Sequence, residues 1–257
     1  MKDLVVISKD ARIGKNVTID AFSSIHENVV IGDNCWIGSN VTIYPGARIG
    51  SNCKIFPGSV ISAIPQDLKF NGEDTTTIIG DNVIIRECVT INRGTSHSNT
   101  TMIGNNVFLM AYSHVAHDCI IHNNVIIANG VAIAGHVEID EYAIIGGLSA
   151  IQQFSKIGKF SMVSGGSLVR KDVPPYIKVA KEPLRFIGIN SIGLKRNNFN
   201  KQQITIISSI FRIIFQEGNN ISKAIEILEK SQENSNEKEE ILKFIKKSKT
   251  GIIKGFY

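Results

Sequence analysis

The chain has 257 residues, 43% of them hydrophobic and 20% charged, which is the composition of an ordinary globular protein and excludes intrinsic disorder. Its most apolar segment, residues 204–215, is interrupted by Ser208, Ser209 and Arg212, so no transmembrane segment is predicted. The 4 cysteines lack a CxxC spacing, and the N-terminus lacks the apolar run of a signal peptide, so we expect a cytoplasmic protein without a disulfide scaffold.

An aliphatic residue recurs every six positions through the first two thirds of the chain. Of the 28 positions in this phase between Ile7 and Val169, 25 are Ile, Leu or Val. The three exceptions are Asp67, Glu73 and His97. They fall near residues 62–78 and 92–102, which we predict to be loops inserted into the repeat. Loops that interrupt a regular scaffold often carry function.

The remaining positions of the hexad specify a short strand followed by a corner. Small side chains stand four positions after each aliphatic residue, where an extended strand points them to the same side. The second and third positions after the aliphatic residue hold turn-forming pairs such as Pro45-Gly46 and Pro57-Gly58, which suit a type II turn. Three strands with three corners close into one coil of a triangular prism, with successive coils ~4.8 Å apart. The repeat therefore predicts a parallel β-helix.

The six-residue repeat ends after Pro174 and Pro175, and the net charge of the sequence becomes positive there. Residues 174–257 hold 15 Lys and Arg against 8 Asp and Glu, a net +7, whereas residues 1–173 carry −2. Apolar residues now follow helical spacing near 204–214, 221–228 and 241–245. We therefore predict an all-β parallel β-helix over residues 1–175 and an α-helical C-terminal domain over residues 176–257.

Histidine and carboxylate side chains gather at the corners of successive coils. His117 and Asp118 occupy one corner, and Gly135 and His136 occupy the corresponding corner one coil later. Gln153 follows at the next corner, while His114 points outward from the adjoining strand. An imidazole beside a carboxylate suits general-base catalysis. A glycine exposes its backbone N–H as an oxyanion donor must.

Further motifs are spread along nearly the whole chain: YSHVAHDC at 112–119, IPQDLKF at 64–70, IIRE at 84–87, TINRGT at 90–95, AGH at 134–136, IGG at 145–147, QF at 153–154, DVPPY at 172–176 and GLKR at 193–196. Together they resemble the motifs of the UDP-N-acetylglucosamine 3-O-acyltransferases of the hexapeptide-repeat family. The resemblance implies a left-handed β-helix that transfers a (3R)-hydroxyacyl chain from acyl carrier protein to the sugar 3-hydroxyl. This reaction is the first step of lipid A biosynthesis, and it needs no cofactor or metal.

The resemblance also assigns roles to residues. It implies that His117 is the general base, that Asp118 supports it and that the N–H of Gly135 stabilises the oxyanion. The positions that match substrate contacts are Gln66, Asp67, Lys69, His114, His136, Gln152, Gln153, Asn190 and Arg196. Gly165 matches the position that sets acyl-chain length, and a glycine there is compatible with a longer chain.

The family's site lies outside the prism and is covered by a neighbouring subunit of a homotrimer. The resemblance therefore makes the first loop and the helical domain candidate contributors in trans. The +7 segment fits an acidic carrier protein, although a solvated basic helix would have the same composition.

Four alternatives remain. The acceptor is the 3-amino analogue of the sugar in some relatives, and Asn92, Gln152 and Asn197 depart from the usual family residues. A zinc γ-type carbonic anhydrase would use His117 and His122, but a catalytic zinc needs a third protein ligand. The other two are a non-catalytic β-helix scaffold and acetyl transfer from coenzyme A, against which the QDLK loop argues. No aromatic-interleaved basic stripe supports nucleic-acid binding.

Overall fold

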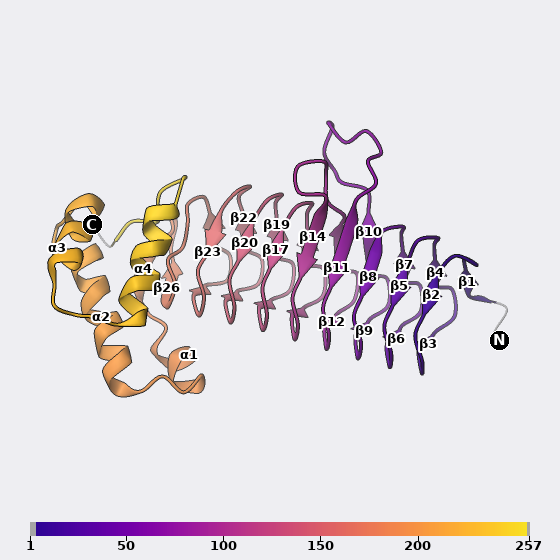
Figure 1. The fold of residues 1–257 in the computed structure, drawn as a ribbon, viewed down its shortest axis with the longest axis horizontal. Coiled ribbons are helices and arrows are strands. Elements are labelled where there is room, and N and C mark those ends of the chain that lie inside the picture. Colours follow the sequence, from indigo (N-terminus) through magenta and orange to yellow (C-terminus); the bar gives the residue numbers. More distant parts are fainter. Residues whose placement is uncertain (1–3, 256–257) are drawn as a thin grey trace.

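The chain folds into a long triangular prism that ends in a group of helices (Figure 1). The structure is a computed structural model that describes residues 4–255. Within those residues, three sheets of nine, eight and ten strands form the faces of the prism, all of them parallel except for one terminal pair. This is the left-handed parallel β-helix that the repeat and the resemblance predict.

Each of the first eight coils contributes one strand to each sheet, and β25 to β27 extend the first and third sheets. The first sheet contains β1 (Val6–Ile7), β4 (Ser24–Ile25), β7 (Thr42–Ile43), β10 (Val60–Ala63), β13 (Thr90–Asn92), β16 (His114–Val115), β19 (Ala132–Ile133), β22 (Ala150–Ile151) and β25 (Leu168–Val169). The second contains β2 (Arg12–Ile13), β5 (Val30–Ile31), β8 (Ala47–Ile49), β11 (Thr76–Ile79), β14 (Thr100–Ile103), β17 (Ile120–Ile121), β20 (Glu138–Ile139) and β23 (Lys156–Ile157). The third contains β3 (Thr18–Ile19), β6 (Trp36–Ile37), β9 (Lys54–Ile55), β12 (Ile84–Ile85), β15 (Phe108–Leu109), β18 (Ile126–Ile127), β21 (Ile144–Ile145), β24 (Met162–Val163), β26 (Ile177–Ala180) and β27 (Arg185–Ile189).

The hexad explains both the strands and the corners. From Ile25 onward the aliphatic residue of each regular hexad is buried inside the prism, whereas Ile7 at the open N-terminal end is 46% exposed. Burial of each such side chain contributes roughly 1.5–3 kcal/mol, so the stack supplies its own core. At the corners, residues such as Asn34 and Asn52 adopt positive φ, a conformation that asparagine tolerates better than most residues.

Two loops leave the prism along one edge, which we call the first edge: the edge where the first sheet turns into the second. One loop connects β10 to β11 across residues 64–75, and the other connects β13 to β14 across residues 93–99. Both project from the same side of the prism in Figure 1. The ladder continues past them, because Ile61 pairs with Ile91 and Ile91 pairs with Val115. The first edge therefore carries two protruding segments beside an unbroken stack of corners.

The region after residue 175 differs in part from the sequence prediction. It begins with β26 and β27, which extend the third sheet and pair antiparallel with each other. The helices are α1 (Ser191–Arg196), α2 (Lys201–Phe215), α3 (Ile221–Lys230) and α4 (Asn236–Lys247). The periodic apolar positions fall within α2, α3 and α4, whereas the two strands and α1 were not predicted. The domain boundary itself stays a prediction.

The last described residues return to the prism, where Asp172 bridges Ile252 and Arg185 bridges Lys254. Within residues 4–255, no helix combines the length and the apolar character that a membrane span requires.

Candidate active site

The corner residues of successive coils stack along the first edge. β16 pairs with β19 and β19 with β22 without a shift in register, so corners one coil apart lie directly above one another. The backbone N–H of His136 donates to the carbonyl of His117 at 3.1 Å. A Cβ added to Gly135 would lie 2.6 Å from Cε1 of His117, so the imidazole rests directly on this glycine. The predicted juxtaposition of His117 with Gly135 is thus present.

Asp118 is held by the second loop. Its Oδ1 accepts hydrogen bonds from the backbone N–H of Thr95 at 3.0 Å and of Ser98 at 3.3 Å, and from the Ser98 hydroxyl. Its Oδ2 accepts from the Thr95 hydroxyl at 2.7 Å and lies 2.7 Å from Nδ1 of His117. The Asp118 backbone N–H donates to the Thr101 hydroxyl at 2.8 Å. This set of hydrogen bonds, which we call the Asp118 cradle, leaves the carboxylate side chain fully buried.

The cradle fixes the charge of Asp118 and, through it, the tautomer of His117. Burial alone would raise the pKa of Asp118, but hydrogen bonds from Ser98, His117 and Thr95 lower it to about 2. Asp118 is therefore ionised near neutral pH and can only accept hydrogen bonds. His117 must then donate from Nδ1, which leaves Nε2 of the neutral ring as a proton acceptor. This is the arrangement that a general base requires.

Three further histidines, His97, His114 and His136, lie in the neighbourhood of His117. The ring of His136 meets the ring of His117 edge-on, with centroids 5.0 Å apart, and meets the ring of His97 at 4.5 Å. Burial lowers the pKa of His136, the Asp118 carboxylate opposes this, and the charges of His117 and His97 lower it further. Burial followed by the charge of His117 also lowers the pKa of His114, whose Nδ1 lies 2.7 Å from the Thr90 hydroxyl. The neutral form is therefore favoured at both His114 and His136.

The backbone N–H of Gly135 has no hydrogen-bond acceptor among the described residues, although it lies beside the His117 ring. An N–H left free next to a base can donate to the oxygen of a reacting carbonyl. Base and oxyanion donor therefore lie close together on the first edge.

The other sequence-predicted residues divide into three sets. Asp67 in the first loop acts electrostatically on His136 and so belongs to this neighbourhood. Gln66, Lys69, Gln152, Gln153 and Arg196 are exposed, and no contact joins them to His117. Gly165 and Asn190 lie elsewhere: Gly165 follows β24 at the edge where the third sheet turns into the first, and Asn190 caps α1. The amide of Asn190 donates to Phe160 O at 2.9 Å and accepts from Gly193 N–H, so both its polar ends are occupied within the chain.

Sequence reasoning missed Thr95, Ser98 and His97. The signal that could have pointed to them is the failure of the hexad at His97, inside a run of residues with hydroxyl side chains. Such residues can supply hydrogen bonds to a carboxylate at a neighbouring corner.

The zinc alternative finds no support in this geometry. His117 follows β16 on the first edge, whereas His122 follows β17 on the edge where the second sheet turns into the third. His122 groups with Glu138 and Asp140, and His117 groups with Asp118 and His136. The two histidines therefore do not contribute to one common group of possible ligands.

The fold and the His117–Asp118–Gly135 site define a hexapeptide-repeat transferase. The bacterial transferase hexapeptide model matches residues 10–35, 28–63 and 100–135, and the model for domain 2 of UDP N-acetylglucosamine O-acyltransferase matches residues 172–253. The chain belongs to the family of acyl-(acyl-carrier-protein)-UDP-N-acetylglucosamine O-acyltransferases.

Three relatives illustrate the match. The chain is 52% identical over 248 residues to the enzyme of that name from Sulfurihydrogenibium sp., which covers 96% of this chain and 92% of the relative. It superposes on the UDP-N-acetylglucosamine acyltransferase from Bacteroides fragilis with a TM-score of 0.97 at 47% identity, covering 99% of this chain and 100% of the other. The Francisella novicida enzyme gives a TM-score of 0.95 at 36% identity, with coverages of 98% and 93%.

Proposed function

We propose that this chain transfers a (3R)-hydroxyacyl group from acyl carrier protein to the 3-hydroxyl of UDP-N-acetylglucosamine, the first step of lipid A biosynthesis. The observation that carries the proposal is the His117–Asp118 pair, 2.7 Å apart, resting on a glycine whose N–H is free. Membership of the family supplies the substrates.

The chemistry follows from the tautomer of His117. Nε2 takes the proton of the sugar 3-hydroxyl as its oxygen attacks the thioester carbonyl, and the ionised Asp118 stabilises the imidazolium that forms. The tetrahedral oxyanion accepts a hydrogen bond from the N–H of Gly135. When the tetrahedral intermediate collapses, its C–S bond breaks and the new C–O bond is kept as the ester. The proton on His117 passes to the thiolate of the carrier.

The charge distribution supports an acidic carrier as the acyl donor. The net +7 lies in residues 174–257, which include helices α1 to α4 at one end of the prism in Figure 1. Such a field steers an acidic partner toward that end of the molecule. Family membership also supports action in the cytoplasm, where acyl carrier protein is available, and the described residues contain no membrane-spanning helix.

The site supports a homotrimer with shared active sites. Gly165, expected to set chain length, and His117 lie on different edges of the same prism, and Asn190 and Arg196 lie at the two ends of α1, where Asn190 contacts Phe160 of a later coil. One active site can use all of these positions only if a neighbouring copy supplies some of them. Leu68 in the first loop is fully exposed, consistent with a loop that reaches toward a second subunit.

Mass spectrometry of the product tests the function. We would supply (3R)-hydroxyacyl carrier proteins of several chain lengths with UDP-N-acetylglucosamine or its 3-amino analogue, and compare the wild type with His117→Ala. An ester product that disappears in His117→Ala supports the proposal, and the accepted chain reports on Gly165. An amide product made only from the 3-amino sugar would show that this sugar, rather than UDP-N-acetylglucosamine, is the acceptor. No transfer to either sugar from a folded oligomer would refute the proposed function.

A further inference from the structure

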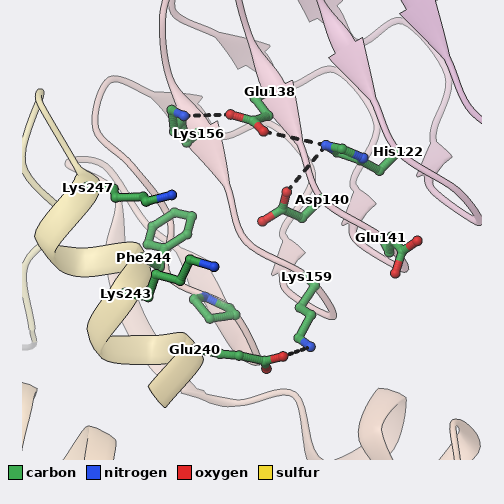
Figure 2. Close-up of a pocket in the computed structure, with 11 residues that line it drawn as sticks. His122, Glu138, Asp140, Glu141, Lys156, Lys159, Glu240, Lys243, Phe244 and Lys247 are labelled. Carbon is green, nitrogen blue, oxygen red and sulfur yellow. Dashed lines mark hydrogen bonds and ion pairs between the residues drawn. The ribbon is translucent and has the colours of Figure 1, made fainter. Parts of the chain in front are cut away.

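A second histidine–carboxylate group lies on another edge of the prism, away from the proposed active site. His122 and Asp140 directly follow the paired residues of β17 and β20, so they occupy the same outward position in adjacent coils, and Glu138 points outward from β20 beside them. Nε2 of His122 lies 3.5 Å from Oε1 of Glu138 and 3.7 Å from Oδ1 of Asp140. Figure 2 shows the imidazole directed toward both carboxylates.

The spacing of the three ligand atoms suits one ion. Ligands about 2.0–2.2 Å from a tetrahedral zinc ion lie about 3.4 Å from one another, which is close to the two separations at His122. All three ligand atoms lie within 4.8 Å of one another. Small side-chain movements of Glu138 and Asp140 would therefore close the set around an ion.

The group leaves Asp140 without a direct cationic partner other than the imidazole. Lys156 donates to Oε2 of Glu138 at 2.6 Å, on the side of that carboxylate away from His122. Among the described residues, neither carboxylate oxygen of Asp140 accepts a hydrogen bond, and its one ion-pair contact is His122 at 3.7 Å. A cation bound by Asp140 would not displace Lys156, which would orient Glu138 from outside.

The other possible set of ligands, His117, Asp118 and His136, differs because its carboxylate oxygens already accept hydrogen bonds. Both oxygens of Asp118 are engaged by the cradle and by His117. The oxygens of Asp140 are available, and the group opens into a cavity of about 420 Å³. The far wall of this cavity is formed by α4, from which Lys243 and Lys247 project (Figure 2). An ion held by three side chains would therefore keep a coordination position open to a water molecule.

We propose that His122, Glu138 and Asp140 form a binding site for a divalent transition-metal ion, with Zn²⁺ as the best match. One imidazole nitrogen and two carboxylate oxygens suit zinc better than magnesium or calcium, which prefer oxygen ligands alone. The site is separate from the proposed transfer chemistry, so metal binding and catalysis are independent properties of the chain.

Isothermal titration of the metal-stripped full-length protein with Zn²⁺ tests the site, with Co²⁺ absorption as a report of tetrahedral coordination. The proposal expects one ion per chain and a loss of affinity of about tenfold or more in both His122→Asn and Asp140→Asn. The matched control, His136→Asn, removes a ligand from the other group and should bind as the wild type does.

Two results would overturn the proposal. One is unchanged Zn²⁺ affinity in both His122→Asn and Asp140→Asn, with melting temperatures like that of the wild type. The other is loss of binding in His136→Asn, which would place the ion at the proposed active site instead. Neither result depends on acyl transfer, so the proposed function would be unaffected.

Discussion

The prism carries two histidine–carboxylate groups on two of its edges, and they differ in what surrounds them. At the first edge, the second loop covers Asp118 and supplies its hydrogen bonds, and His117 is only 7% exposed. At the other edge no loop interrupts the coils, and His122 and Asp140 are only half-buried beside an open cavity. A regular repeat brings a histidine and a carboxylate together equally well at either edge. An inserted loop is what turns the pair into an oriented base.

The largest predicted difference between the two groups is in catalysis. His117→Ala removes the proton acceptor and should lower kcat by about 10²- to 10⁴-fold. His122→Ala, the matched control, should keep kcat within about twofold, because its ring takes part in no step of the transfer. Steady-state acyl transfer with both variants measures this difference, and similar losses in the two variants would contradict it.

Substitution of Gly135, the glycine beneath His117, should lower kcat nearly as much as substitution of His117. Gly135→Ala would place a methyl group 2.6 Å from Cε1 and 2.7 Å from Nε2 of the imidazole, so the ring must move away. We expect kcat to fall about 10²-fold, the scale of a lost oxyanion contact, because base and N–H are displaced together. Kinetics should be accompanied by thermal melting. A variant that is fully active and as stable as the wild type would show that the ring is free to rearrange.

The Asp118 cradle should appear in the pH dependence of stability. Because the folded-state pKa of Asp118 is lowered from 3.8 to about 2, its contribution is fully present above pH 3.8 and is lost as the pH falls toward 2. The contribution near neutral pH is about 2 kcal/mol. Denaturant unfolding of wild type and Asp118→Asn should therefore give a stability difference that shrinks below pH 4. A stability difference that does not change with pH would contradict the claim that the cradle stabilises the ionised form of Asp118.

The smallest predicted effect is the loss of kcat on substitution of Thr95, a positioning residue in the Asp118 cradle. Thr95→Val removes one hydroxyl donor to Asp118 while its backbone N–H and both Ser98 donors remain. Since a hydrogen bond to a charged group is worth about 1.5–3 kcal/mol and three donors persist, we expect kcat to fall about tenfold with KM unchanged. Thr95→Ser keeps the hydroxyl and should restore the rate. A change in KM alone would indicate substrate contact instead.

The sequence predicts the fold well because the repeat is local. Each hexad specifies its own strand and corner, so the stacking of His117 over Gly135 follows from counting three hexads along an uninterrupted stretch. The C-terminal strands were missed because β26 and β27 depart from the six-residue phase and are held by pairing with β24 and with each other.

The site was harder to predict where it depends on contacts across the chain. Thr95 and Ser98 reach Asp118 over 23 and 20 positions, so their hydrogen bonds to it depend on how the second loop folds against that corner. The resemblance assigns Asn190 to substrate binding, and its side chain also caps α1 and donates to Phe160 O. Its role in substrate binding stays a prediction.

Long-range ¹H–¹⁵N spectra of the histidine rings test the central claim most directly, because they report which nitrogen of His117 carries the proton. We predict that the neutral His117 ring is protonated at Nδ1 and unprotonated at Nε2, and that Asp118→Asn weakens this preference. The resonances of His122 provide an internal reference that Asp118→Asn should leave unchanged. A neutral His117 protonated at Nε2 in the wild type would contradict its role as the base.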